Sequence, residues 1–323
     1  MAESVPPPAP EADLSRVRTV PIAGRANKVD PSLLAHPPGA DRGVDAFLAS
    51  LPDLLAAADL KTVIAAVAAA TGRRGVIVQA GGHVVKTGLG PLLIHLMERG
   101  AITHLAMNSA ASIHDFELCA YGGTSEDVAA GLGDGTFGMA EETGREMNAA
   151  IARGQAEGLG MGEALGRALE TRAARPGDAE CVLLAARRHR IPVTVHAALG
   201  TDIIHQHPAA DGAAIGDTSF RDFRRLAGAV PDLDEGGVVL NLGSAVIMPE
   251  VFLKALTVAR NLAGGRPRNF VAADFDMIQH YRPRMNVVER PTLGGGRGYS
   301  ITGHHEINIP LLVWGVVAQL DAR

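Results

Sequence analysis

Short apolar runs alternate with longer amphipathic segments along most of the chain. Apolar runs of about five residues bounded by turn residues predict buried strands, at 75–80, 102–107, 191–197, 238–242 and 269–274. Apolar positions that recur with helical spacing predict helices, at 43–70, 92–99, 113–118, most of 126–188, 220–226, 249–263 and 309–320. Strands that alternate with helices predict an α/β fold, with a doubly wound, mostly parallel, Rossmann-like sheet and helices on both faces.

The first 40 residues lack this alternation. Residues 1–14 are rich in proline and alanine and predict a disordered tail, whereas residues 17–38 are basic and broken by prolines and predict an arm or short strands. We therefore expect a partly disordered tail and arm over residues 1–40, and a single domain over residues 41–323.

Composition narrows the class of protein. The formal net charge is −5 and no basic patch is present, which argues against nucleic-acid binding. The longest apolar runs, such as 309–317, are too short to cross a membrane. Cys119 and Cys181 lack a CxxC spacing, and the N-terminus lacks the pattern of an export signal, so we expect a cytoplasmic protein.

Small and acidic residues follow the predicted strands. Ligands of open α/β sheets bind beyond the carboxyl ends of the strands, so these positions predict the ligand site. They are Gly81, Gly82 and His83, then Asn108 and Ser109, Thr201 and Asp202, Gly243 and Ser244, and Asp274 and Asp276.

The loop GGHVVKTGLG, residues 81–90, joins the first strand to a helix. Its glycines would let backbone N–H groups face a pyrophosphate, although their order differs from GxGxxG and a plain tight turn is the alternative. Lys86 in this loop would pair with a phosphate or act as a nucleophile, with an exposed surface charge as the alternative.

The second strand end carries Ser109, Ala110, His114 and Asp115. Carboxylates at such a place suit ribose hydroxyls. The alternative is helix capping, with Ser112 as the N-cap and Asp115 in the first turn. Capping does not account for His114.

His205, His207 and Asp211 follow the third strand end and could hold a metal ion, although neighbouring loop histidines more often form hydrogen bonds. Glu250 would bind a cationic substrate or, as the alternative, stabilise the positive end of a helix dipole. His305 would join the site or lie in an exposed polar turn, and the glycine run 294–298 predicts a flexible loop.

In their order along the chain, these segments resemble deoxyhypusine synthase over residues 40–320. The segments are GGHVVKTGLG, MNSAASIHDFE, HAALGTDII, NLGSAVIMPEV, ADFDMIQHYRPR and HEINIPLLVWGVVAQL. The resemblance implies NAD as cofactor, a homotetramer or dimer of dimers, and transfer of an aminobutyl group from spermidine through a lysine imine. By position it implies cofactor contacts at Gly88, Ser109, Ala110, Asp115, Asp202, and Asp274 or Asp276.

The chain departs from that family at its catalytic lysine. The corresponding stretch, 289–298, holds no lysine, and none follows Lys254. An imine needs a primary amine, which arginine cannot supply. The sequence therefore predicts a divergent, bacterial-type relative that is not a genuine deoxyhypusine synthase, unless Lys86 takes over the role.

We expect an NAD-dependent transferase or oxidoreductase that acts on a polyamine or another small amine or hydroxyl compound. His114, His205 or His305 would be the base, and Asp202, Asp274 and Glu250 would hold a cationic substrate. The predicted cofactor contacts are Gly82, Gly88, Ser109, Ala110, Asp115, Asp202, Gly243, Ser244, Asp274 and Asp276. The alternatives are a metal-dependent hydrolase or lyase that uses His205, His207 and Asp211, and a non-catalytic NAD-binding protein.

Overall fold

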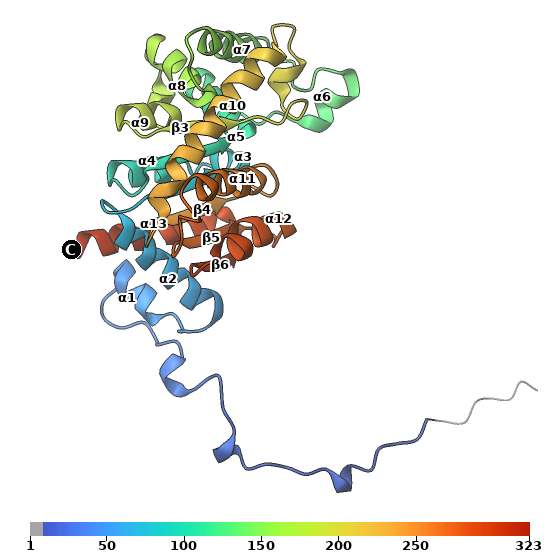
Figure 1. Ribbon diagram of the computed structural model, residues 1–323, viewed down its shortest axis with the longest axis vertical. Helices are drawn as coiled ribbons and strands as arrows, with labels where there is room; N and C mark the ends of the chain where they lie inside the picture. Colours follow the sequence, from blue (N-terminus) through green and yellow to red (C-terminus); the bar gives the residue numbers. More distant parts are fainter. Residues whose placement is uncertain (1–8) are drawn as a thin grey trace, which may run out of the picture.

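The computed structural model describes residues 9–323, in which six parallel strands form one sheet (Figure 1). The strands are β1 (Val76–Ala80), β2 (His104–Asn108), β3 (Val193–His196), β4 (Val238–Leu242), β5 (Val271–Asp276) and β6 (Arg297–Thr302). Their order in the sheet is β3-β2-β1-β4-β5-β6, and every neighbouring pair is parallel. The strand order reverses between β1 and β4, which is the topological switch point of a Rossmann-like fold.

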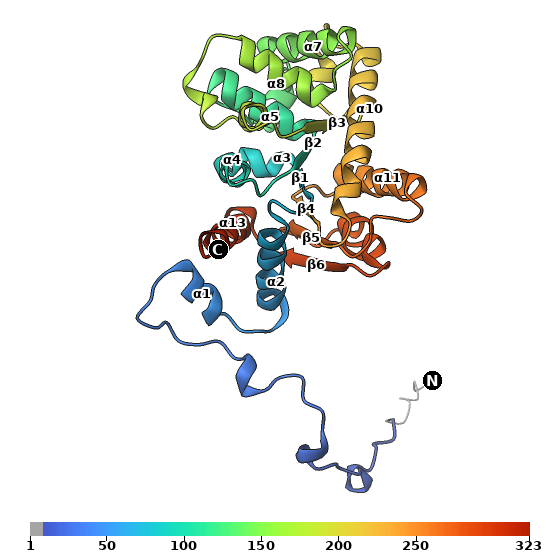
Figure 2. The same ribbon diagram turned by 60° about the vertical axis from the view of Figure 1, so that its left-hand side comes forward.

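Helices cover both faces of the sheet, as the sequence predicts. In Figure 2, α2 (Leu55–Ala70), α4 (Gly90–Glu98) and α13 (His305–Asp321) lie on one face, and α10 (Gly212–Ala229) and α11 (Ile247–Leu262) lie on the other. Every residue of β1 and β4 is buried. A strand covered on both sides needs apolar residues at every position, which explains the continuous apolar runs in the sequence.

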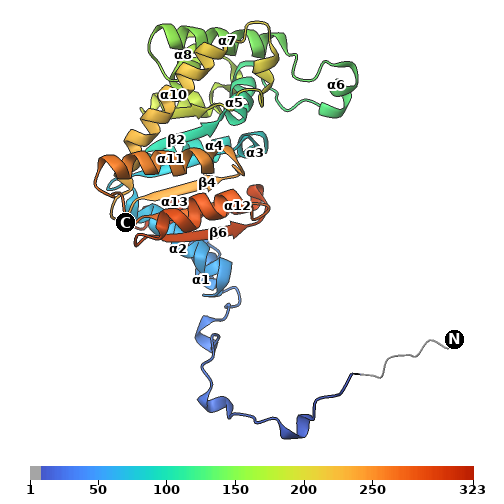
Figure 3. The ribbon, with the colours of Figure 1, turned by 45° about the vertical axis from the view of Figure 1, so that its right-hand side comes forward.

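A group of helices extends the molecule beyond the β3 edge. It contains α5 (Ser109–Tyr121), α7 (Glu141–Ala156), α8 (Met161–Thr171) and α9 (Val182–Arg188), and α6 (Val128–Asp134) projects away from the body in Figures 1 and 3. The fully buried Asp222 of α10 joins this group to the sheet, because it accepts N–H bonds from Gly162 of α8 and Val195 of β3, both at 2.8 Å.

Two predicted elements differ from the structure. The single helix predicted at 43–70 is two helices, α1 (Val44–Ser50) and α2, with a break beside Pro52. Proline disfavours helical geometry in the residue before it. The glycine run 294–298 was predicted as a flexible loop, but Arg297 and Gly298 are the first two residues of β6, the outermost strand beside β5. The short helices α3 (Gly82–Lys86) and α12 (Tyr281–Pro283) complete the helical elements, the latter continuing into a π-helical turn at Arg284–Glu289.

The described part of the N-terminal segment stands apart from the body in all three views. Residues 9–40 are almost entirely exposed and contain three short 3₁₀ turns, Leu14–Arg16, Ile22–Gly24 and Pro31–Leu33, and none of the short strands that were the alternative to an arm at 17–38. Most of the tail predicted at 1–14 lies outside the described residues. Within residues 9–323, no helix has the length and hydropathy that crossing a membrane requires.

Candidate functional site

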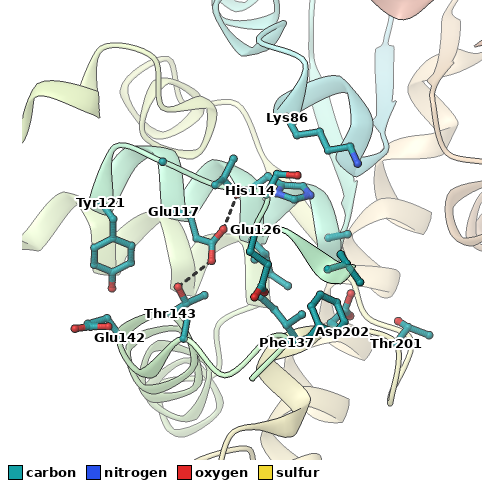
Figure 4. A pocket seen from close by; sticks show the side chains of 18 residues that line it. Lys86, His114, Glu117, Tyr121, Glu126, Phe137, Glu142, Thr143, Thr201 and Asp202 are labelled. Atoms are coloured by element: carbon teal, nitrogen blue, oxygen red, sulfur yellow. Dashed lines mark hydrogen bonds between the residues drawn. The ribbon is translucent and has the colours of Figure 1, made fainter. Parts of the chain in front are cut away.

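A cavity of about 620 Å³ lies at the carboxyl ends of β1, β2 and β3 (Figure 4). We call it the strand-end cavity. Lys86 of α3 and His114 of α5 line it together with the loop after α5, the start of α7 and the segment after β3. Its polar side chains include Lys86, His114, Glu117, Thr124, Glu126, Glu142, Thr143, Thr201 and Asp202. The structure thus brings the predicted Lys86, Ala110, His114 and Asp202 to one cavity.

His114 and Glu117 share one side of α5, because residues three positions apart are neighbours on a helix. His114 Nδ1 lies 2.7 Å from Thr124 Oγ1, and that hydroxyl donates to Glu117 Oε2 at 2.5 Å. Thr143 of α7 donates to the other oxygen of Glu117 at 2.9 Å. Burial, with smaller contributions from Lys86 and His83, lowers the pKa of His114. Burial therefore favours the neutral imidazole over the protonated form.

Ser109 and Asp202 form a second pair in this region. Asp202 is buried after β3, and burial raises the pKa of its carboxyl group even though the Ser109 hydroxyl donates to it. His205 lies beside this pair in the 3₁₀ turn Ile203–Gln206, and its Nδ1 accepts the N–H of Gly200 at 3.1 Å. His205 Nε2 lies 3.9 Å from Asp202 Oδ2 and is buried without a hydrogen-bond partner.

The ends of β4, β5 and β6 carry a different arrangement, which we call the closed cluster: Asp274, Asp276 and His305. Asn241 donates to Asp274 at 2.8 Å, and burial raises the pKa of Asp274 to about 7. His305 is 1% exposed, and its Nε2 lies 3.8 Å from Asp276 Oδ1. The alternative of an exposed polar turn is therefore wrong for His305, which begins α13 inside the protein.

Two glycines, Gly81 and Gly243, pack against each other between the strand-end cavity and the closed cluster. A Cβ atom at Gly81 would lie 2.0 Å from the carbonyl oxygen of Gly243, so the turns after β1 and β4 touch through their backbones. Gly243 has a φ of +63°, and a Cβ there would lie 2.8 Å from His305 Nε2. Packing and backbone geometry thus require glycine at both positions. The prediction that glycines of the loop 81–90 face a pyrophosphate did not include this role. Ser244 beside Gly243 is buried, and its hydroxyl accepts the N–H of Met248 in α11.

Several predicted site residues lie outside the strand-end cavity. Asp115 is fully buried and accepts the N–H groups of Val182 and Leu183, both at 2.8 Å, at the start of α9. Burial raises the pKa of Asp115 to about 6. Asp115 thus has a capping role toward α9, and a cofactor hydroxyl would find its oxygens already bonded. The N-cap of α5 is Asn108, which accepts the N–H of Ala111, rather than Ser112.

Glu250 lies in a surface group of ion pairs. It contacts Lys254, Arg282 and Asn286, and the charges and hydrogen bonds of Lys254 and Arg282 lower the pKa of its carboxyl group. Gly88 is exposed in a left-handed turn after α3, with a φ of +84°. Gly82 lies closer to the cavity, because a Cβ there would come within 3.2 Å of His114 Cδ2.

The three residues of the metal hypothesis bind separate partners. His207 Nε2 lies 3.2 Å from Glu141 Oε2, and Asp211 caps α10 by accepting the N–H groups of Ala213 and Ala214. Within residues 9–323, no three His, Cys, Asp or Glu side chains are arranged to hold a metal ion.

Glu117, Thr124 and Thr143 are not among the predicted site residues, although Glu117 belongs to the segment MNSAASIHDFE. The spacing of His114 and Glu117 on a helix could have indicated the first of them. Nothing in the sequence indicates the two threonines, because they come from a loop and from a separate helix.

No family model matches the chain, and no curated protein sequence matches it. Solved structures match it across most of its length. A candidate deoxyhypusine synthase from Entamoeba histolytica has a TM-score of 0.53 at 13% identity, over 85% of this chain and 92% of that one. The likeness is one of fold.

A candidate LOR/SDH protein from Methanococcus maripaludis S2 has a TM-score of 0.50 at 16% identity, over 81% of this chain and 68% of that one. A complex of AgrE with ornithine and NAD⁺ has a TM-score of 0.48 at 16% identity, and the match spans 32% of that chain. This last superposition is too loose to support an argument about function.

Proposed function

We propose that the protein is an NAD-dependent enzyme that oxidises a small amine or hydroxyl compound, such as a polyamine, in the strand-end cavity. One observation carries the proposal: a cavity lined by segments that follow β1, β2 and β3 combines His114, whose neutral form is favoured by burial, with several carboxylates. Ligand sites of open α/β sheets occupy this place, and histidine is the commonest general base at neutral pH.

The charge of the cavity favours a cationic substrate. Glu117, Glu126, Glu142 and Asp202 line it, and Lys86 is the positively charged side chain among its lining residues. Tyr121 and Phe137 add aromatic surface, which suits the methylene groups of an aliphatic amine and attracts its charge. In Figure 4, Tyr121 and Glu142 lie at one end of the cavity, and Thr201 and Asp202 lie at the other.

The residues fit NAD in two respects. Asp202 is a buried strand-end carboxylate that already accepts one hydroxyl, from Ser109, and carboxylates of this kind bind ribose hydroxyls. Lys86 supplies a positive charge beside the turn after β1, where a phosphate group would be held. A volume of about 620 Å³ lies within the ordinary range for small-molecule sites.

The proposed chemistry needs one proton acceptor from the protein. NAD, when bound, would supply the acceptor for a hydride from the carbon that bears the nitrogen or oxygen. His114 takes the proton from that nitrogen or oxygen, so that a C=N or C=O double bond forms and both hydrogens are accounted for. Lys86 is the lysine that lines this cavity, and transfer through a lysine imine would have to use it.

Titration of the full-length protein with NAD by calorimetry tests the proposal first. We expect binding, and we expect Asp202→Asn to weaken it about 10-fold, because a neutral amide accepts a ribose hydroxyl less strongly. NADH formation is then followed with a panel of diamines, polyamines and amino alcohols. Glu163→Gln, on α8 and outside the cavity, is the matched control. Folded protein that does not bind NAD would contradict the proposal.

A further inference from the structure

We infer that Thr124 is a positioning residue that fixes the tautomer of His114, so that Nδ1 carries the hydrogen and Nε2 is the basic atom. The catalytic meaning of this inference rests on the proposed function. The hydrogen-bond geometry behind it does not, because it follows from three side chains of the free protein.

The Thr124 hydroxyl has a single hydrogen to donate. An ionised carboxylate only accepts hydrogen bonds, so the short contact between Thr124 Oγ1 and Glu117 Oε2, 2.5 Å, uses that hydrogen. Thr143 donates to the other carboxylate oxygen at 2.9 Å, which also holds Glu117 as an acceptor. Thr124 Oγ1 is then left with lone pairs alone.

His114 Nδ1 lies 2.7 Å from those lone pairs. Two acceptors at this distance would repel each other, so Nδ1 must carry a hydrogen and donate it. A neutral imidazole carries one ring hydrogen, and therefore Nε2 bears the free lone pair. The structure gives Nε2 no hydrogen-bond partner among the described residues, and His114 lines the strand-end cavity.

The neighbours of the ring keep it in this orientation. Gly82 lies against the Cδ2 edge of His114, where a Cβ atom would approach to 3.2 Å, and Ala110 lies against the same glycine. When Nε2 takes a proton, the Nδ1–H bond to Thr124 continues through its hydroxyl to the Glu117 carboxylate. That negative charge stabilises the imidazolium, as the orienting carboxylate does in catalytic triads.

Thr124 belongs to the segment that joins α5 to α7 and contains α6. The segment leaves α5 at Gly122 and returns at Gly138, with left-handed φ angles of +79° and +75°, and α6 between them has no buried residue. Glu126 closes the base of the segment by accepting the N–H of Gly138 at 2.9 Å. The tautomer of His114 therefore depends on where this segment lies over the cavity.

Tautomers are measured directly by long-range proton–nitrogen correlation spectra of protein whose histidines carry a nitrogen isotope label. The chain has 12 histidines, and a His114→Gln variant identifies the signal of interest. At a pH where His114 is neutral, we expect the Nδ1–H form. We expect Thr124→Val, which keeps the shape but removes the hydroxyl, to convert the signal to the Nε2–H form or a mixture, and Thr124→Ser to restore it.

Thr136→Val is the matched control on the same segment, because the Thr136 hydroxyl binds Asp134 at the surface. It should leave the His114 signal unchanged. An Nε2–H form in the unmodified protein, or an Nδ1–H form that survives in a folded Thr124→Val variant, would overturn the inference.

A kinetic measurement separates this inference from the proposed function. With an active substrate, Thr124→Val should lower kcat at least about 10-fold with little change in KM, because the base is misoriented while binding groups remain. Thr124→Ser should keep most of the rate. The expected tautomer without NAD-dependent turnover would contradict only the proposed function, whereas turnover without the expected tautomer would contradict only the role of Thr124.

Discussion

The two halves of the carboxyl edge of the sheet carry the same kinds of residue in different surroundings. Beyond β1, β2 and β3, His114 and several acids surround the strand-end cavity. Beyond β4, β5 and β6, His305, Asp274 and Asp276 are 1–7% exposed. The position of a titratable residue at a strand end therefore does not by itself determine its environment. The environment depends on the helices that cover that strand end.

The covering helices differ for a simple reason of topology. In the first half, α7 lies beyond the edge of the sheet in Figure 2, and the segment between α5 and α7 lines the cavity. In the second half, the chain turns back directly from β6 into α13, whose first residue is His305. This short connection packs the histidine against Gly243 and its neighbours.

The junction between the two halves should be the most sensitive point. Gly81→Ala places a Cβ atom 2.0 Å from a backbone oxygen, which cannot move away as a side chain can. We expect a loss of about 3 kcal/mol or more in the free energy of unfolding, measured by denaturant titration. Gly82→Ala, whose Cβ meets only side chains at 3.2 Å or more and backbone at 3.4 Å, is the control and should lose less than about 1 kcal/mol. Equal losses would show that the halves do not meet rigidly there.

Replacing His114 should mainly lower activity, whereas replacing His305 should mainly lower stability. His114→Ala should lower turnover about 100-fold, equivalent to about 2.7 kcal/mol, with little change in unfolding. His305→Ala should instead destabilise the fold by about 2 kcal/mol, because it empties a buried site. Turnover assays and thermal unfolding of both variants test the pair. The reverse result would make the closed cluster the active centre.

The buried acid of the closed cluster should make stability depend on pH. Because the pKa of Asp274 is raised to about 7 in the folded protein, the folded state holds its proton more tightly than the unfolded state. Its contribution is complete below about pH 4 and is lost as the pH rises through about 7. Asp274→Asn should therefore gain on the order of 2 kcal/mol relative to the parent between pH 4 and pH 8. Free energies of unfolding that change with pH in the same way for the parent and for Asp274→Asn would contradict this prediction.

The smallest effect is expected at the surface of the second half. Glu250→Gln weakens exposed ion pairs with Lys254 and Arg282, which are worth about 0.5 kcal/mol. We expect turnover and NAD affinity to stay unchanged, because Glu250 lies outside the strand-end cavity. A large loss of turnover would extend the active centre to the second half.

Burial on two sides made much of the fold predictable from sequence. The predicted strand 238–242 has the bounds of β4, because every one of its residues is buried. β6 was missed, because a strand at the edge of a sheet needs no continuous apolar run, and Gly298 and Ser300 give no strand signal. Pro52 gave the signal for the break between α1 and α2, but the apolar pattern continues across it.

The candidate site was predictable only where it lies at strand ends. Lys86, His114 and Asp202 follow three neighbouring strands, so the parallel sheet brings them together. Asp115 and Glu117 show the limit. They are two positions apart on α5 and point to different sides of the helix, so one caps α9 while the other binds Thr124. The sequence offers no way to choose between them before the neighbours of α5 are known.

The contact between Gly81 and Gly243 also bears on how relatives of this chain can be recognised. Catalytic side chains can change when an enzyme takes up a new substrate, whereas two backbones that touch exclude every larger residue whatever the chemistry. A distant relative that keeps this sheet should carry glycine at both places, even where its histidines and carboxylates differ. The glycine pair is thus a requirement of this packing of the sheet, independent of the chemistry of the cavity.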